Sequence, residues 1–260
     1  KSGNTLTRSI LSSYFFSKTG RFKFDYLDKI KQFPLAKDFM SLGIDVSNNV
    51  EVFKNFINFQ KFINQENKNI NFLKTHSSLC KIYNANFTDY QNSLGVIYIV
   101  RDPRNVVTSL VNHYGYNIDE ATKIITNEKK FLDKSPKNCS VFVGSWSFNF
   151  NSWKEFQKKN KYILVKYEDL IKRKKTVFIR IFKFFEQLGI KLELDMSKLN
   201  MALKSTEFEK MKSLEKKEEF DEALIDEKTG KRRIFFNLGP KNDWRKLLDD
   251  KNKLIIEETF

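Results

Sequence analysis

The segment that most constrains the fold is GVIYIVRDPRNVVTSLVNH, residues 95–113. Five β-branched or aromatic residues, Val96–Val100, form a run typical of a central strand in a parallel sheet. Asp102 before Pro103 is typical of a helix N-cap with proline at the first helical position, and Gly115 can end that helix. The segment therefore predicts a buried strand, a sharp turn and a helix.

Two side chains of this segment indicate an anion-binding site. Arg101 leaves the carboxyl end of the strand, and Ser109 lies two turns into the helix. Ligands of open α/β sheets bind at this edge. An arginine fork matches phosphate oxygens, and a helix start adds partial positive charge. We therefore expect an anion to be held where the guanidinium and the hydroxyl converge.

The rest of the chain alternates between strand-like and helix-like patterns. Such alternation predicts an α/β fold with a central parallel β-sheet flanked by helices on both faces. With 260 residues and no break in composition, we expect a single domain. Beyond the opening segment, we expect strands at residues 69–76 and 162–165 and helices at residues 118–132, 144–156 and 176–188.

A short loop, KSGNT, precedes the first helical run. Gly3 would let the backbone approach a ligand, and the following N–H groups, together with Lys1, would form an anion cradle. The loop lacks the second glycine and the Gly-Lys-Ser/Thr ending of a Walker A loop. A nucleoside triphosphatase or a nucleotide kinase is therefore disfavoured.

The expected strand at residues 69–76 ends in Lys74, Thr75 and His76. A neutral imidazole at the carboxyl end of a strand can take a proton from a hydroxyl nucleophile, and a lysine on the same face can neutralise a leaving group. A histidine that only binds backbone is an equally open interpretation of that position. We interpret His113, the other histidine, as structural.

The chain carries 47 Lys and Arg against 32 Asp and Glu, a net charge of +15. Because lysines alternate with acids in the charged runs, we favour ordinary surface charge over a nucleic-acid or membrane surface. Two isolated cysteines, Cys80 and Cys139, predict free thiols and a reducing compartment. No apolar run reaches transmembrane length. The chain starts and stops inside motif-like patterns, so we expect it to be truncated at both ends.

Together these ordered motifs resemble the cytosolic-type sulfotransferase family, which uses 3′-phosphoadenylyl sulfate (PAPS). KSGNT is similar to the family's loop around the 5′-phosphosulfate, Lys74-Thr75-His76 to its catalytic-base segment, and RDPRNVVTS to its 3′-phosphate segment. Gly144-Ser145-Trp146, Tyr167-Glu168-Asp169 and STEFEKM follow in the family's order. The resemblance implies a P-loop-nucleotide-kinase-like sulfotransferase fold over residues 1–260.

The resemblance also implies an activity. A cytoplasmic enzyme would move a sulfuryl group in line from PAPS, without a metal ion, to a hydroxyl or amine of a small-molecule acceptor. It implies that His76 is the general base, that Lys1 and Lys74 stabilise charge, and that Ser109 restrains the loop lysine. The implied donor-binding residues are Lys1, Ser2, Gly3, Asn4, Thr5, Arg101, Ser109, Tyr167, Thr206, Phe208 and Gly239.

The sequence departs from the family pattern at several positions. Leu6 replaces the loop tryptophan, which implies one-sided adenine stacking, and Asn4 replaces a threonine. Asn237, Leu238 and Gly239 stand where the family has Arg-Lys-Gly. The family's dimer segment is absent after Trp244, so the resemblance predicts no dimer by that route. Arg232, Arg233 or Lys241 are candidates to supply the lost positive charge.

Two further questions stay open at this stage. The aromatic segment 20–68 is either a lid over the acceptor pocket or a set of ordinary covering helices. The alternative function is a noncatalytic basic module that binds nucleotides or nucleic acid, which we favour less. That module predicts strongly salt-dependent binding to DNA or RNA and indifference to loss of His76.

Overall fold

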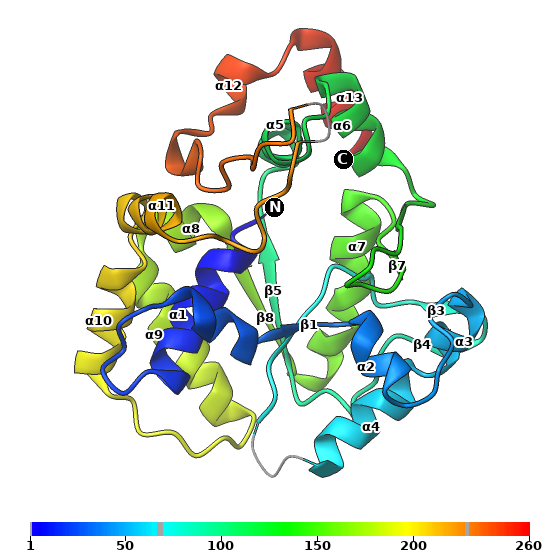
Figure 1. The fold of residues 1–260 in the computed structure, drawn as a ribbon, viewed down its shortest axis with the longest axis vertical. Helices are drawn as coiled ribbons and strands as arrows, with labels where there is room; N and C mark the ends of the chain where they lie inside the picture. The colour runs from blue at the N-terminus through cyan, green and yellow to red at the C-terminus, as the bar shows by residue number, and fades with distance from the viewer. Residues whose placement is uncertain (1, 67–69, 227–228) are drawn as a thin grey trace.

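The computed structural model describes residues 2–66, 70–226 and 229–260. The prediction for Lys1 lies outside these residues. Two parallel strands, β5 (Val96–Val100) and β8 (Tyr162–Lys166), occupy the middle of the molecule, and helices lie on either side of them (Figure 1).

The strand-turn-helix predicted from the opening motif is confirmed. After β5, helix α5 (Pro103–Tyr114) starts with Pro103 at its first turn, and the Asp102 side chain accepts a hydrogen bond from the Arg104 backbone N–H at 2.9 Å. Gly115 ends α5 with φ 75°, in the left-handed region that glycine adopts without strain. All three signals lie within the segment or two residues after it, so this strand, turn and helix follow from local chemistry.

The predicted single central parallel sheet is confirmed only in part. Within the described ranges the strands form four two-stranded sheets, of which two are parallel and two antiparallel. The strand expected at residues 69–76 is only two residues long and pairs with a short strand from residue 31 onward instead of extending the β5–β8 pair. The short strands pair as β1 (Lys31–Gln32) with β2 (Leu73–Lys74), β3 (Lys81–Ile82) with β4 (Ala85–Asn86), and β6 (Phe131–Leu132) with β7 (Val141–Phe142).

Alternating side chains of β5 enter two hydrophobic cores, which explains why helices cover both faces as expected. Ile97 and Ile99 pack into the first core, between β8 and three helices, whereas Val96 and Tyr98 pack into the second, which is rich in phenylalanine. The first core is covered by α1 (Asn4–Phe16), α9 (Lys174–Gln187) and α10 (Met196–Ser205), and the second by α2 (Ala36–Met40), α3 (Asn49–Lys54), α4 (Phe56–Glu66) and α7 (Trp146–Trp153).

The helix predicted at residues 118–132 is shorter than expected. Helix α6 (Ile118–Thr126) ends early, because Phe131 leaves the helical path to pack against Phe142 with ring centroids 5.0 Å apart. Its cap is Asn117, which forms a capping box with Glu120. The helix predicted at 144–156 divides into α7 and the 3₁₀ helix η2 (Lys154–Lys159).

Most of the remaining elements lie around the upper half of the molecule, whereas the short helix at Phe24–Lys29 packs against α1 (Figure 1). A third cluster of phenylalanines joins the segment after α1 to the segment after α11, through Phe22, Phe220 and Phe236. The elements concerned are η1 (Phe24–Lys29), α8 (Tyr167–Lys172), α11 (Phe208–Lys217), η3 (Gly239–Lys241), α12 (Trp244–Leu247) and α13 (Asp250–Thr259).

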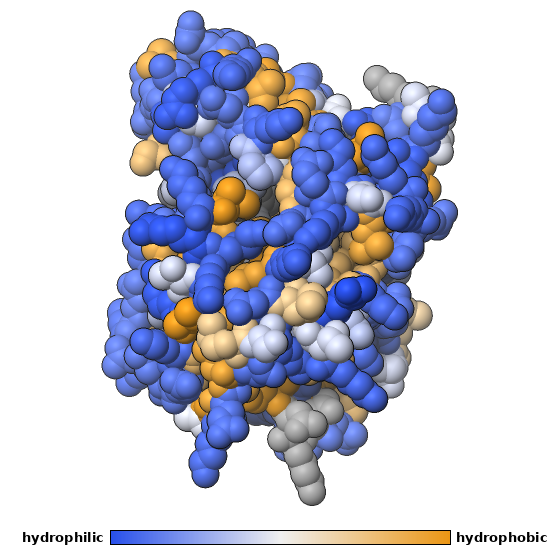
Figure 2. All heavy atoms as spheres, turned by 90° about the vertical axis from the view of Figure 1, so that its left-hand side faces the viewer, coloured by the Kyte–Doolittle hydropathy of each residue, from blue (hydrophilic) through white to orange (hydrophobic). Residues whose placement is uncertain are grey.

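The surface is mainly hydrophilic on the face that carries α9, α10 and α11. Figure 2 shows polar and charged residues over most of that face, with apolar residues exposed in small groups between them. Both cysteines are free, as predicted, and burial raises the pKa of each thiol to about 11. No helix in the described part of the chain combines the length and the apolar character needed to cross a membrane.

Candidate active site

Helix α1 begins without a capping side chain. Its N-cap residue is Gly3, with φ 92°, which makes no side-chain cap hydrogen bond to the first turn. The leading N–H groups of a helix have no partner inside the helix, so this end keeps unsatisfied donors and partial positive charge. A Cβ on Gly3 would come within 2.8 Å of the Tyr167 ring, so a glycine is required for this close approach.

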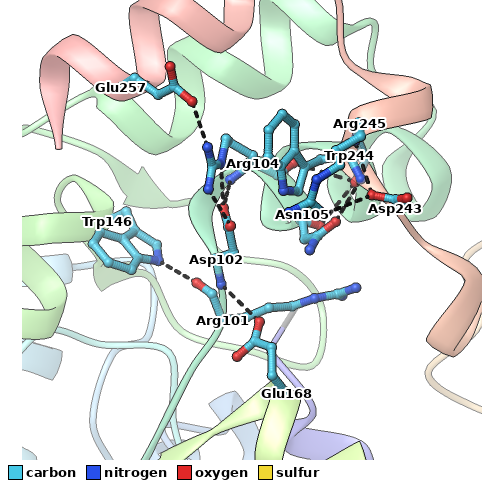
Figure 3. A network of polar contacts seen from close by, with 11 residues as sticks. Arg101, Asp102, Arg104, Asn105, Trp146, Glu168, Asp243, Trp244, Arg245 and Glu257 are labelled. Atoms are coloured by element: carbon cyan, nitrogen blue, oxygen red, sulfur yellow. Dashed lines mark hydrogen bonds and ion pairs between the residues drawn. The ribbon is translucent and has the colours of Figure 1, made fainter.

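Tyr167 connects this loop to the cation at the end of β5. The Arg101 guanidinium carbon lies 4.1 Å from the centroid of the Tyr167 ring, and Arg101 is only 5% exposed. Burial lowers the pKa of Arg101, but an arginine stays charged at neutral pH. Trp146 Nε1 donates to the Arg101 carbonyl at 3.2 Å and so fixes the backbone at this turn (Figure 3). Gly3, Tyr167 and Arg101, predicted separately, therefore lie together.

The start of α5 carries the carboxylate of its N-cap residue, Asp102. Arg104 donates to both oxygens of Asp102, at 3.0 and 2.8 Å, pairs with Glu257 at 2.5 Å, and lies over the Trp244 ring at 3.9 Å. Figure 3 shows that the Arg101 side chain points away from this group. Asp102 therefore places a carboxylate at the start of α5 and accepts the Arg104 N–H, which opposes the positive charge expected there; the contribution of this helix start to the anion site stays a prediction.

Ser109 lies half-buried on α5, next to the point where the C-terminal segment is attached. Thr108 donates to the Asn242 side chain at 2.7 Å, and Trp244 N–H donates to the side chain of Asn105 at 2.9 Å. These bonds hold residues 239–244 along α5. The contact brings Gly239, another predicted donor-binding residue, to the same side of the molecule as Ser109.

Phe208 and Gly239 are also brought together. A Cβ on Gly239 would approach the Phe208 ring to 2.2 Å, so the ring lies directly on the glycine. Thr206 is fully buried at the end of α10, and its hydroxyl donates to the Ala202 carbonyl at 2.7 Å. The Thr206 hydroxyl is therefore bonded to the last turn of α10 in this structure.

A second group of side chains gathers around Lys74. Its Nζ donates to Gln32 Oε1 at 2.5 Å. Burial lowers the pKa of Lys74 to about 8, which the nearby charge of Glu222 partly opposes and the charge of Arg8 reinforces. The Glu222 carboxylate accepts a hydrogen bond from Thr5 Oγ1 at 3.0 Å and forms an ion pair with Arg8. Two predicted residues, Lys74 and Thr5, thus meet around a carboxylate that the sequence did not single out.

Glu222 was missed because it lies in a charged stretch without periodicity or motif. Its neighbours Glu218, Glu219 and Asp221 are also acidic, so no spacing distinguishes it. Its contacts depend on folding across 217 residues to Thr5, which local reasoning cannot detect.

His76 is half-buried, and its backbone is held firmly. The His76 carbonyl accepts from Asn149 Nδ2 at 3.2 Å, and the Ser77 carbonyl accepts from Trp153 Nε1 at 2.9 Å. Both donors belong to α7, so this helix positions the segment. His113 packs edge-on against Phe235 with centroids 5.3 Å apart, in line with the structural role expected of it.

The positions that depart from the family pattern have structural uses. Leu6 packs against the first core, and Asn237 Nδ2 donates to Asn112. Arg232 pairs with Glu219 at 2.9 Å and Arg233 pairs with Asp226, whereas Lys241 lies exposed in η3. Two of the three cations considered for the lost charge are therefore already paired with carboxylates.

Comparison with curated proteins gives matches among sulfotransferases. Sulfotransferase 2A1 of Macaca fascicularis is 29% identical over 125 residues, which cover 47% of this chain and 40% of that protein. The 3-beta-hydroxysteroid sulfotransferase of Cavia porcellus is 26% identical over 159 residues, 60% of this chain and 51% of that protein. The matches thus span about half the length of these relatives.

Solved structures show the same fold. Mouse sulfotransferase SULT7A1 complexed with PAP matches with a TM-score of 0.53 at 21% identity, over 77% of this chain and 69% of that chain. Retinol dehydratase in complex with androsterone and inactive cofactor PAP matches with a TM-score of 0.57 at 16% identity, over 100% of this chain and 76% of that chain. The sulfotransferase domain family matches residues 1–260. With the whole sequence matched and the fold shared, the chain belongs to the sulfotransferase domain family.

Proposed function

We propose that this chain is a PAPS-dependent sulfotransferase that transfers a sulfuryl group to a hydroxyl or amine of a small acceptor. The observation that carries the proposal is the position of Tyr167, which touches the glycine of the uncapped α1 loop on one side and the buried Arg101 on the other. The Tyr167 ring therefore lies between the start of α1, where an anion can bind, and a buried cation. A ligand that carries anionic groups at two places could contact both positions.

The residues present fit such a donor. The first turn of α1 keeps unsatisfied N–H donors, and Asn4 Oδ1 is buried without a hydrogen-bond partner in the described part of the chain. Rotation of the Asn4 amide would present N–H groups to an anion. Arg101 would hold the 3′-phosphate together with Ser109, and Phe208 on Gly239 would offer a face to adenine. When bound, PAPS supplies the sulfuryl group and a phosphate leaving group.

The chain's own residues would act mainly by position and charge. His76 would accept the proton of the acceptor hydroxyl as the new S–O bond forms and the bond to the phosphate oxygen breaks. Lys74, with a pKa of about 8, is mostly protonated at neutral pH and would stabilise charge on the departing phosphate. The backbone hydrogen bonds from α7 would keep His76 in place for this step.

The names of the relatives direct the acceptor search. The Cavia porcellus relative is named for 3-beta-hydroxysteroids, and one matching structure contains androsterone. We therefore propose alcohols on apolar rings as the first acceptor class to screen. The aromatic segment 20–68, whose phenylalanines form much of the second core, remains our proposal for one wall of the acceptor pocket.

The decisive test is calorimetric titration with adenosine 3′,5′-bisphosphate (PAP), alongside ATP. We expect binding in the micromolar range that requires the 3′-phosphate and is lost in Arg101→Ala, because the buried guanidinium provides the matching charge. Arg245→Ala, which removes an exposed arginine, is the matched control and should bind PAP normally. Equal affinity for PAP and ATP, or unchanged PAP binding by Arg101→Ala, would contradict the proposal and favour a general nucleotide- or nucleic-acid-binding module.

A further inference from the structure

A carboxylate from a distant part of the chain reaches the first turn of α1. Glu222 lies in the turn that follows Phe220, and its oxygens are shared between the Thr5 hydroxyl, at 3.0 Å, and the Arg8 guanidinium. The two residues of the ion pair are only 10% and 30% exposed at the side chain. The contact is therefore partly buried and differs from the more exposed ion pairs on this surface.

Arg8 anchors this carboxylate. Its other terminal nitrogen donates to the carbonyls of Leu27 and Ile30, each at 3.0 Å, so the guanidinium is fixed against the segment that follows α1. A buried guanidinium needs a counterion, and Glu222 provides it. Burial raises the pKa of Glu222, but the charges of Arg8 and Lys74 outweigh this effect, so the pKa lies below its usual value. The carboxylate is therefore ionised at neutral pH.

Thr5 is where this carboxylate and the donor would compete. A threonine hydroxyl has one hydrogen to donate, and in this structure Glu222 accepts it. Thr5 belongs to the KSGNT loop that we expect to surround the phosphosulfate end of the donor, so on the proposed function that end needs the same hydroxyl. Two anions cannot accept the same hydrogen, and two anions that both approach one hydroxyl repel each other.

We propose that Glu222 is an internal competitor of the sulfuryl donor: its carboxylate occupies Thr5 in the donor-free protein and releases it when the phosphosulfate end binds. This inference rests on the proposed function. Arg8 keeps the released carboxylate nearby, so the turn around Glu222 responds to donor binding. Glu222 thereby sets the affinity for the 5′ end of the donor without contacting the acceptor.

The test is the effect of Glu222→Gln on two probes, PAP and adenosine 3′-phosphate, which lacks the 5′ group. We expect PAP to bind about five- to tenfold more tightly, because the charge-assisted competing bond is lost. Adenosine 3′-phosphate should bind as in the wild type. Glu219→Gln removes an exposed acid three residues earlier and is the matched control, with no expected change for either probe.

A second variant guards against loss of folding. Glu222→Gln leaves Arg8 without a counterion, so the double variant Arg8→Met with Glu222→Gln removes both charges and should also bind PAP more tightly. Unchanged or weaker PAP binding in the folded variants would overturn the inference, and so would equal tightening for both probes, which indicates a general charge effect. Failure of the proposed function gives a different result, because the wild-type protein would then bind PAP no more tightly than ATP. In that case the inference about Glu222 is also wrong.

Discussion

The starts of α1 and α5 differ in how a carboxylate meets the first turn of the helix. Helix α5 satisfies its first turn with Asp102, a neighbour in sequence that is itself held by Arg104. Helix α1 has a glycine at the same place, which provides no side-chain cap, and the carboxylate of Glu222, far away in the chain, accepts from the Thr5 side-chain hydroxyl instead of capping the backbone. A local cap is part of the helix and cannot leave without destabilising it. A carboxylate brought by tertiary contacts can be exchanged for a ligand, as we propose for Glu222 at Thr5, so the difference contrasts a structural helix end with one that we propose binds the donor.

The largest expected effect concerns His76, on the segment that α7 holds next to Lys74. His76→Ala should slow sulfuryl transfer by about 10²- to 10⁴-fold, because the acceptor proton loses its base. The measurement is single-turnover transfer from PAPS, with PAP affinity checked by calorimetry and expected to be unchanged. His113→Ala, which removes the other histidine, is the control and should transfer at the normal rate. A rate loss below tenfold in His76→Ala would show that the chemistry lies elsewhere.

An intermediate effect is expected at the start of α5. Asp102→Ala removes the cap and the partner of Arg104, so the free energy of unfolding should fall by about 1 to 2 kcal/mol, while PAP affinity changes little. Urea unfolding and calorimetry measure the two quantities. Asp195→Ala, which removes the cap of α10, should lose a similar amount of stability. If Asp102→Ala instead weakens PAP binding more than stability, the start of α5 is functional and the comparison fails.

The smallest effect is a shift in the pH dependence of transfer. Lys74 has a pKa of about 8, and Glu222 raises it. If protonated Lys74 supports transfer, the rate should fall as the pH rises past about 8. Glu222→Gln removes the carboxylate that favours the protonated amine, so this fall should move to lower pH. Rate profiles between neutral and alkaline pH test this, with Glu219→Gln as the control; a shift toward higher pH would contradict the assignment.

Much of the fold could be predicted where local signals decide it. The β5–α5 unit and the end of α9 at Gly189 follow from cap, proline and glycine positions within a few residues. The length of α6 and the pairing of β2 could not be predicted in the same way. Both depend on partners elsewhere in the chain: Phe142 draws Phe131 out of the helix, and β2 pairs with a strand some 40 residues before it.

The candidate site also has features that the sequence predicts and features that depend on tertiary contacts. Ordered motifs were enough to identify the family to which the chain belongs, and they predict Gly3, Lys74, His76 and Arg101 as site residues, because each motif is a short arrangement of residues suited to its chemistry. The contact of Tyr167 with both Gly3 and Arg101, and the carboxylate of Glu222 on Thr5, exist only in the folded chain. Backbone preferences act over a few residues, whereas burial and charge act between whichever side chains folding brings together, so the charge balance of the site is a property of the tertiary structure.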